Sequence, residues 1–179
     1  GGTGARGGAA VWGNATAGRK GTPTAVNDLV TAETNPPTAG TITVGTFANT
    51  AVCDTVREEL RETAAFALDH VWTIPLTTGT AHTFTAVAWT DSATQQEVLQ
   101  WGTSLAGPWT TMFNVTQLAS PGCGAPLTFV LPGALTGNLF IRAFPGATNG
   151  ARNRLNVDYM AVVTTVPGTP PFFTLNYDF

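Results

Sequence analysis

A hydrophobic period of two residues, repeated in short segments along most of the chain, constrains the fold more than any other feature of the sequence. Apolar and polar residues alternate, with turn signals spaced 8–15 residues apart, over 41–46, 67–74, 109–116, 127–131, 138–144 and 155–163. Two further strands are expected near 83–90 and 95–101, where both faces are partly apolar. Many short alternating segments joined by Gly- and Pro-containing turns indicate two packed antiparallel sheets. The sequence therefore predicts an all-β, jelly-roll-like antiparallel β-sandwich.

We predict one sandwich domain over residues 23–165, with extended segments at both ends of the chain. Residues 1–22 are a Gly-rich extension with almost no apolar periodicity. Residues 166–179 begin with a Pro-rich spacer, which cannot join a central strand because proline lacks the N–H group that a sheet ladder needs. Inside the domain, residues 54–67 contain good helix formers, so that helix and strand both remain open there.

The two ends of the chain carry segments that can pair with another molecule. The C-terminal segment alternates again, and its apolar face consists of Phe173, Leu175, Tyr177 and Phe179. In the N-terminal extension, the large apolar side chains are Val11 and Trp12. An extended segment with alternate apolar side chains can add a strand to an exposed sheet edge. These ends favour a structural subunit that self-assembles with other copies of itself, in a filament or surface sheath, by strand donation from either terminus.

The low charge of the chain excludes several classes of protein. Charged residues make up 11% of the sequence, the net charge is −3, and lysine and arginine together number 8. Disorder driven by charge is therefore excluded, and a basic surface for nucleic acid is not expected. No apolar run reaches the roughly 20 residues of a membrane-spanning helix, so we expect no membrane insertion.

The two cysteines point to the compartment. Cys53 and Cys123 fit one disulfide in an exported protein, and the start at Gly1 rather than Met favours a processed, secreted chain. Two buried free thiols are the alternative. Two distant cysteines alone cannot supply the ligands of a metal site. We therefore expect an extracellular or cell-surface protein with a Cys53–Cys123 bond.

Four short segments carry a family resemblance over residues 51–165. They read VREELRE at 56–62, HVWTI at 70–74, NLFIR at 138–142 and NVDYM at 156–160. This part of the chain resembles a β-sandwich accessory module of the galactose-binding-like jelly-roll type, found in secreted bacterial and archaeal proteins. The resemblance implies a non-catalytic role, with an Arg late in one strand and an Asp in the last strand belonging to the scaffold.

Residues that could support catalysis do not form a local pattern. His70 shares an apolar face with neighbouring core residues, which predicts a buried structural histidine, and His82 follows a turn, which predicts an exposed loop residue. The serines have no base partner near them in the sequence, and no nucleophile-elbow motif is present. We therefore predict that the chain is not an enzyme.

Acidic residues are read as structural. Glu58 and Glu62 lie beside Arg57 and Arg61, which predicts ion pairs along one surface. The spacing of the carboxylates specifies no glycosidase pair. No cofactor is expected, although a structural Ca²⁺ could take oxygens from a scattered acidic set, namely Asp28, Glu33, Asp54 and Asp91.

Aromatic residues give the second functional hypothesis. Trp101 and Trp109 flank one loop, where they could form an aromatic patch on which a sugar ring stacks. The competing interpretation is core packing, since alternation places Trp72 and Trp109 inward. The sequence thus leaves two hypotheses, self-assembly and a non-catalytic carbohydrate-binding accessory module, with self-assembly favoured by the chain ends.

Overall fold

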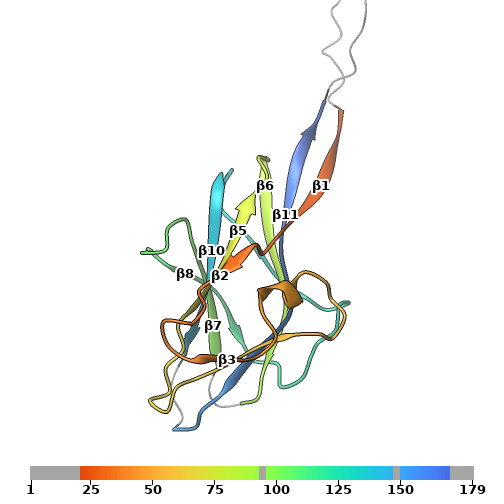
Figure 1. Ribbon diagram of the computed structural model, residues 1–179. Helices are drawn as coiled ribbons and strands as arrows, with labels where there is room; N and C mark the ends of the chain where they lie inside the picture. Colours follow the sequence, from red (N-terminus) through yellow and green to blue (C-terminus); the bar gives the residue numbers. More distant parts are fainter. Residues whose placement is uncertain (1–20, 93–95, 147–149, 170–179) are drawn as a thin grey trace, which may run out of the picture.

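The computed structural model describes residues 21–92, 96–146 and 150–169, which form two antiparallel sheets around one core (Figure 1). Sheet A contains β1 (Gly21–Leu29), β3 (Thr41–Val44), β4 (Glu58–Arg61), β6 (Ala81–Thr90), β9 (Leu127–Val130) and β11 (Arg154–Gly168). Sheet B contains β2 (Ala32–Glu33), β5 (His70–Leu76), β7 (Glu97–Gly102), β8 (Thr110–Val115) and β10 (Gly137–Pro145). The predicted all-β antiparallel sandwich is confirmed.

The order of strands places the longest element at the centre of each sheet. Sheet A runs β3-β4-β11-β6-β9, and β1 also pairs with β11, beyond the end of β4. Sheet B runs β2-β5-β10-β7-β8. A single 3₁₀ turn, η1 (Phe47–Thr50), interrupts the strands within the described residues. In that part of the chain, no helix has the length and apolar character needed to cross a membrane.

The core is built by the alternation that the sequence shows. On β10, Leu139, Ile141 and Ala143 are fully buried, and the residues between them lie on the opposite face. The facing layer of sheet A contributes buried side chains from β6 and β11, including Phe84 and Leu155. Each fully buried large apolar side chain stabilises the fold by about 1.5–3 kcal/mol relative to its exposed state.

The segment left open between helix and strand contains strand β4. Its residues pair with β11 on one side and with β3 on the other. Glu58, Leu60 and Glu62 have no exposed surface, and Glu59 between them is 6% exposed. The ladders on both sides therefore define this segment as a strand. The predicted placement of Glu58 and Glu62 along the surface is therefore wrong. Both carboxylates point into the protein.

Strand β11 runs past the point where the sequence predicted its end. It continues through Pro167 to Gly168, and Gly21 of β1 lies opposite Gly168. The neighbouring strand β6 pairs with β11 only as far as Thr165, so no ladder on that side needs the N–H group that proline lacks. β1 and the end of β11 form a two-stranded ribbon that projects from the sandwich (Figure 1). The sequence analysis expected neither β1 nor β2.

The two histidines are both buried in strands. His70, at the start of β5, lies in the interior as predicted. His82 was predicted to be an exposed loop residue, and it is instead fully buried near the start of β6. Its Nδ1 lies 2.9 Å from the hydroxyl of Thr164, which in turn donates to Asp28 at 2.6 Å. The hydroxyl of Thr77 also donates to Asp28, so that hydrogen bonds compensate for the burial of this polar network.

Burial sets the protonation of the glutamate beside His70. Desolvation lowers the pKa of His70 to about 4. Desolvation, together with the neighbouring Glu33 carboxylate, raises the pKa of Glu58 to about 9. At neutral pH the imidazole is therefore neutral and Glu58 holds a proton, so the short contacts among these three side chains are not ion pairs.

A disulfide joins Cys53 to Cys123, as the sequence predicted. It links the segment after η1 to the loop between β8 and β9, across a separation of 70 residues. Close to the bond, the carboxylate of Asp158 in β11 accepts hydrogen bonds from the backbone N–H groups of Asp54 and Thr55. The covalent bond and this carboxylate together fix the loop that precedes β4.

Replacing both cysteines by serine is expected to lower the free energy of unfolding by about 2–4 kcal/mol, because the open chain gains conformational entropy when it unfolds. Urea denaturation of the oxidised wild type and of the double variant measures the difference. A variant as stable as the oxidised wild type would contradict this role for the bond.

A second buried glutamate makes the fold sensitive to pH. Glu97, at the start of β7, is fully buried, and the carboxyl group of Glu62 lies beside it. Burial, with the nearby charges of Glu62 and Asp91, raises the pKa of Glu97 from 4.5 to about 8. The folded protein therefore keeps a proton that the unfolded chain releases.

The sign of this linkage gives a prediction. Between pH 4.5 and pH 8 the unfolded chain binds fewer protons at Glu97, so the contribution of Glu97 to the free energy of unfolding falls as pH rises and is greatest below pH 4.5. Glu97→Gln removes the titrating group, so its stability should fall less between pH 5 and pH 8 than that of the wild type. Parallel denaturation curves at the two pH values test this. Equal losses in both proteins would show that Glu97 is not the source.

Candidate functional site

The candidate site lies on the outer face of sheet B, which is the face turned away from the core. Because Leu139, Ile141 and Ala143 of β10 fill the interior, the alternate residues Arg142 and Phe144 project outward. From the neighbouring strand β5, Val71 lies on the same face. The alternation that turns the core residues of β10 inward therefore also turns the site residues outward. β10 is the central strand of sheet B.

Arg142 is held by a bidentate pair. Its Nε donates to Oδ1 of Asp69 at 2.7 Å, and its Nη2 donates to Oδ2 at 2.8 Å. Asp69 immediately precedes β5, and both side chains keep about a fifth of their surface exposed. Two parallel hydrogen bonds fix the plane of the guanidinium. Arginine has five N–H donors, so three remain after this pair for other partners.

Two aromatic rings flank the guanidinium. The Cζ atom of Arg142 lies 5.5 Å from the ring centre of Trp109 and 4.5 Å from that of Phe144. Phe144 is 39% exposed, which is high for a large apolar side chain on a strand. We call Trp109, Arg142 and Phe144 the aromatic–arginine row. The row presents ring faces and N–H donors side by side on an open surface.

Two glycines, Gly102 and Gly107, allow the backbone to pack against the ring of Trp109. A Cβ atom on Gly107 would lie 2.9 Å from the Trp109 ring, and one on Gly102 would lie 3.3 Å from it. Gly107 also has φ of +80°, a conformation that favours glycine. The ring therefore packs closely against the β7–β8 loop. Its position is fixed before any ligand arrives, which reduces the entropy lost on binding.

A hollow of about 210 Å³ opens beside the row. Side chains from four segments line it, namely Thr34, Thr38, Asp69, Val71, Leu105, Trp109 and Arg142. The lining combines hydroxyls, one carboxylate, one guanidinium and apolar surface. Leu105, in the β7–β8 loop, is 59% exposed at its rim. Such a mixture suits a ligand that has both apolar faces and many hydroxyl groups.

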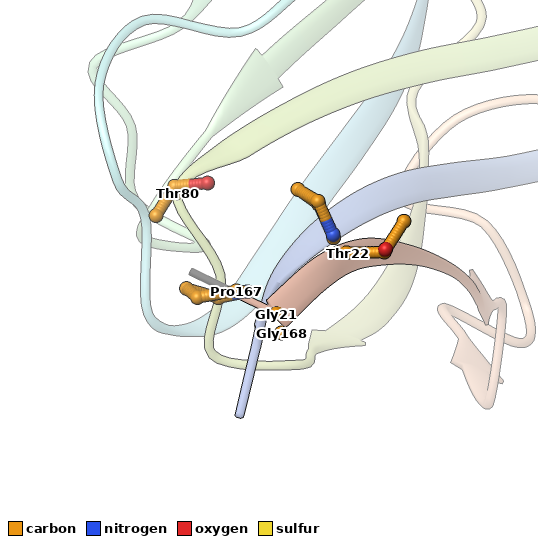
Figure 2. Close-up of a pocket in the computed structure, with 6 residues that line it drawn as sticks. Gly21, Thr22, Thr80, Pro167 and Gly168 are labelled. Atoms are coloured by element: carbon orange, nitrogen blue, oxygen red, sulfur yellow. The ribbon is translucent and has the colours of Figure 1, made fainter. Parts of the chain in front are cut away.

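A larger hollow of about 670 Å³ lies at the tip of the ribbon formed by β1 and β11. Figure 2 shows its lining, which consists of threonine, proline and glycine residues, including Thr22, Thr80 and Pro167. No charged or aromatic side chain of the described residues lines it. The hollow offers little to recognise a ligand, so the chemistry of the molecule points to the outer face of sheet B.

The structure separates the two tryptophans of the predicted patch. Trp109 lies on the outer face and joins Arg142, contrary to the alternative that places it in the core. Trp101 lies opposite Ile141 in the register of β7 and β10, so its ring packs against the core. Sequence reasoning missed Asp69, Arg142 and Phe144 as partners. The signal was present in β10, where an arginine and a phenylalanine share the face opposite the core residues.

Two other predictions from the sequence concern the assembly segments and the residues named for Ca²⁺. The proposed assembly strands, Phe173, Leu175, Tyr177, Phe179, Val11 and Trp12, lie outside the described residues, and assembly stays a prediction. The acidic residues named for Ca²⁺ do not converge. Asp28 belongs to the His82 network, Asp54 accepts from the N–H of Val56, and Asp91 accepts from the N–H of Arg154. Glu33 instead lies beside Glu58 and His70.

Comparison with known proteins finds similarity to solved structures only. No protein-family model matches the sequence, and no curated protein matches it. A truncated AlyQ with CBM32 and alginate lyase domains is similar at 16% identity and a TM-score of 0.48, covering 83% of this chain and 36% of that one. The present chain thus spans about a third of that structure.

Two single modules are also similar. TmCBM61, in complex with β-1,4-galactotriose, has 10% identity and a TM-score of 0.44, covering 79% of this chain and 88% of that one. The CBM36-1 domain of a multidomain xylanase from the hindgut metagenome of Trinervitermes trinervoides has 16% identity and a TM-score of 0.41. The match covers 79% of this chain and 96% of that one. The TM-scores of these three structures are all below 0.5.

The Arg142–Asp69 pair should be energetically coupled, because both hydrogen bonds are short and partly shielded from water. A double-mutant cycle with Arg142→Gln and Asp69→Asn is expected to give a coupling free energy of about 1–2 kcal/mol in urea denaturation. The matched pair is Arg57–Glu59 on sheet A, a single contact of 3.2 Å with a more exposed arginine. Its cycle should give less than about 1 kcal/mol. Equal coupling in the two cycles would contradict the bidentate description.

Proposed function

We propose that this domain is a non-catalytic module that binds a neutral polysaccharide on the outer face of sheet B. The observation that carries the proposal is the aromatic–arginine row beside a hollow lined with hydroxyls and a carboxylate. A pyranose has apolar C–H groups on its ring faces and hydroxyl groups around its edge. The rings of Trp109 and Phe144 match the first, and Arg142 with Asp69 matches the second.

Charge balance favours a neutral ligand. Asp69 neutralises the guanidinium of Arg142, so the row presents hydrogen-bond donors and acceptors without net charge. An acidic polysaccharide would need an uncompensated cation at the hollow. Arg142 is the one cationic side chain in the lining, among the described residues, and it is paired. The sequence as a whole carries a net charge of −3, which repels polyanions.

The size of the hollow favours a chain over a single sugar. At about 210 Å³ it is smaller than typical small-molecule pockets of about 300–1,000 Å³. It accommodates one sugar unit, and further units would lie along the open face toward Phe144 and Gln100. Affinity should therefore rise from monosaccharide to oligosaccharide. The domain would act by holding a polymer, and an extracellular location, where disulfides persist, fits that role.

Affinity electrophoresis in gels that contain individual polysaccharides tests the proposal. Neutral galactan, xylan, mannan and glucan are compared with acidic alginate and pectin, and binding to oligosaccharides of the best polymer is then measured by calorimetry. We expect retardation by at least one neutral polymer. Trp109→Ala should weaken the binding by about tenfold or more, since truncation of an anchoring aromatic residue costs more than 1.4 kcal/mol.

Trp89→Ala is the matched control. Trp89 is half-buried in β6 on sheet A and also lies beside an arginine, with the Cζ atom of Arg57 at 5.9 Å from its ring centre. This variant removes a similar tryptophan–arginine contact from the opposite sheet and should bind as the wild type does. The proposal fails if no neutral polymer retards the protein, or if Trp89→Ala weakens binding as much as Trp109→Ala.

A further inference from the structure

Three polar side chains meet inside the sandwich, away from the proposed glycan site. Glu33 belongs to β2, Glu58 to β4 and His70 to β5, so that both sheets contribute to the cluster. The side chains of Glu58 and His70 have no exposed surface, and that of Glu33 is 4% exposed. Two carboxyl groups and an imidazole in such a position need a partner of opposite charge or a full set of hydrogen bonds.

Three buried polar atoms face one another at the centre of this cluster. They are Oε2 of Glu33, Oε1 of Glu58 and Nε2 of His70, and each is buried. Nε2 of His70 lies 3.5 Å from the first oxygen and 3.4 Å from the second. All three atoms lie within 4.8 Å of one another. An imidazole nitrogen without exposed surface is thus aimed into the space between two carboxyl oxygens.

The surrounding residues orient two of these groups from behind. The indole Nε1 of Trp72 donates to the other oxygen of Glu58, Oε2, at 2.8 Å. Nδ1 of His70 lies 3.4 Å from the hydroxyl of Thr34, which also accepts from the backbone N–H of Val71. When Nδ1–H donates to this hydroxyl, the lone pair of Nε2 points toward the carboxylates. Such outer contacts are typical of groups that bind a metal ion.

We propose that Glu33, Glu58 and His70 bind a divalent transition metal ion of the Zn²⁺ type. At Zn–ligand distances of about 2.0–2.1 Å, the edges of a coordination tetrahedron are about 3.3–3.4 Å long. The two nitrogen–oxygen separations are 3.4 and 3.5 Å, so two edges of the triangle already have the length that a tetrahedron needs. The two carboxyl oxygens lie within 4.8 Å of each other. One nitrogen and two carboxylates form a donor set that Zn²⁺ accepts, and the fourth position is left to water.

The donor set distinguishes this ion from the alkaline-earth cations. Ca²⁺ takes six to eight oxygen ligands, and Mg²⁺ takes an octahedron of oxygens with several waters. Here one of three donors is an imidazole nitrogen, and the site is closed by core residues such as Trp72. Two carboxylates also balance the charge of a divalent cation in an interior where charge is expensive to leave unpaired.

The metal would have a structural consequence. β2 has two residues and is held by β5 alone, and β4 has four residues. A shared ion would join these short strands across the interior, so the folded state would become more stable as the free metal concentration rises above the dissociation constant. This inference rests on the interior of the sandwich and is independent of glycan binding.

Calorimetric titration of the chelator-treated, oxidised full chain with ZnCl₂ tests the proposal. We expect one Zn²⁺ per chain and a thermal midpoint that rises with the metal concentration. The same protein loaded with Co²⁺ should show the intense visible d–d bands of a four-coordinate ion. His70→Gln and Glu58→Gln should each weaken Zn²⁺ binding by about 100-fold or more, because loss of a ligand exceeds the 10–100-fold effect of an outer contact.

Matched controls use the same chemistry elsewhere in the core. His82→Gln alters the other buried histidine, and Glu97→Gln alters another fully buried glutamate outside the cluster. Both should bind Zn²⁺ as the wild type does. The wild-type Co²⁺ spectrum does not depend on whether a variant folds. An octahedral spectrum, no stoichiometric uptake of Zn²⁺, or control variants that lose binding equally would each overturn the proposal.

Discussion

The position of β10 at the centre of sheet B links the core to the surface. Its alternate residues Leu139, Ile141 and Ala143 are fully buried against sheet A, so their neighbours cannot turn inward without exposing them. Arg142 and Phe144 are therefore held outward on a strand that has partners on both edges, β5 and β7. A one-residue slip would destroy the core and the aromatic–arginine row together, so the stability of the fold fixes the geometry of the proposed site.

The charged and titratable side chains lie in two kinds of environment, the solvent-exposed outer face of sheet B and the interior. On the outer face of sheet B, the guanidinium of Arg142 is paired with Asp69 and remains in contact with solvent, where its other donors can serve a ligand. In the interior, Glu58 and Glu97 have no cationic partner among the described residues, and burial raises the pKa of each. The first arrangement favours recognition of a neutral ligand. The second lowers the stability of the folded state as pH rises, because both carboxyl groups then lose a proton inside the protein.

Local alternation predicted most strands and the sandwich, because burial with a period of two can be recognised from consecutive residues such as those of β10 and β11. Features that depend on distant partners were not predictable. Pro167 joins β11 because β6 has already ended, and Glu58 is buried because His70 and Trp72 come from the other sheet. Of the two tryptophans predicted to form an aromatic patch, Trp109 lies on the outer face, whereas Trp101 in β7 packs against the core.

Chemical-shift mapping tests whether the outer face of sheet B recognises a glycan. An isotope-labelled full chain is titrated with the oligosaccharide that binds best, and the backbone, indole and guanidinium N–H signals are followed. The account predicts that shifts concentrate on the Trp109 indole, on Arg142 Nε–H and on the outward residues of β10, and that the Trp89 indole on sheet A stays unchanged. Shifts centred on sheet A, or on the tip of the β1–β11 ribbon, would contradict it.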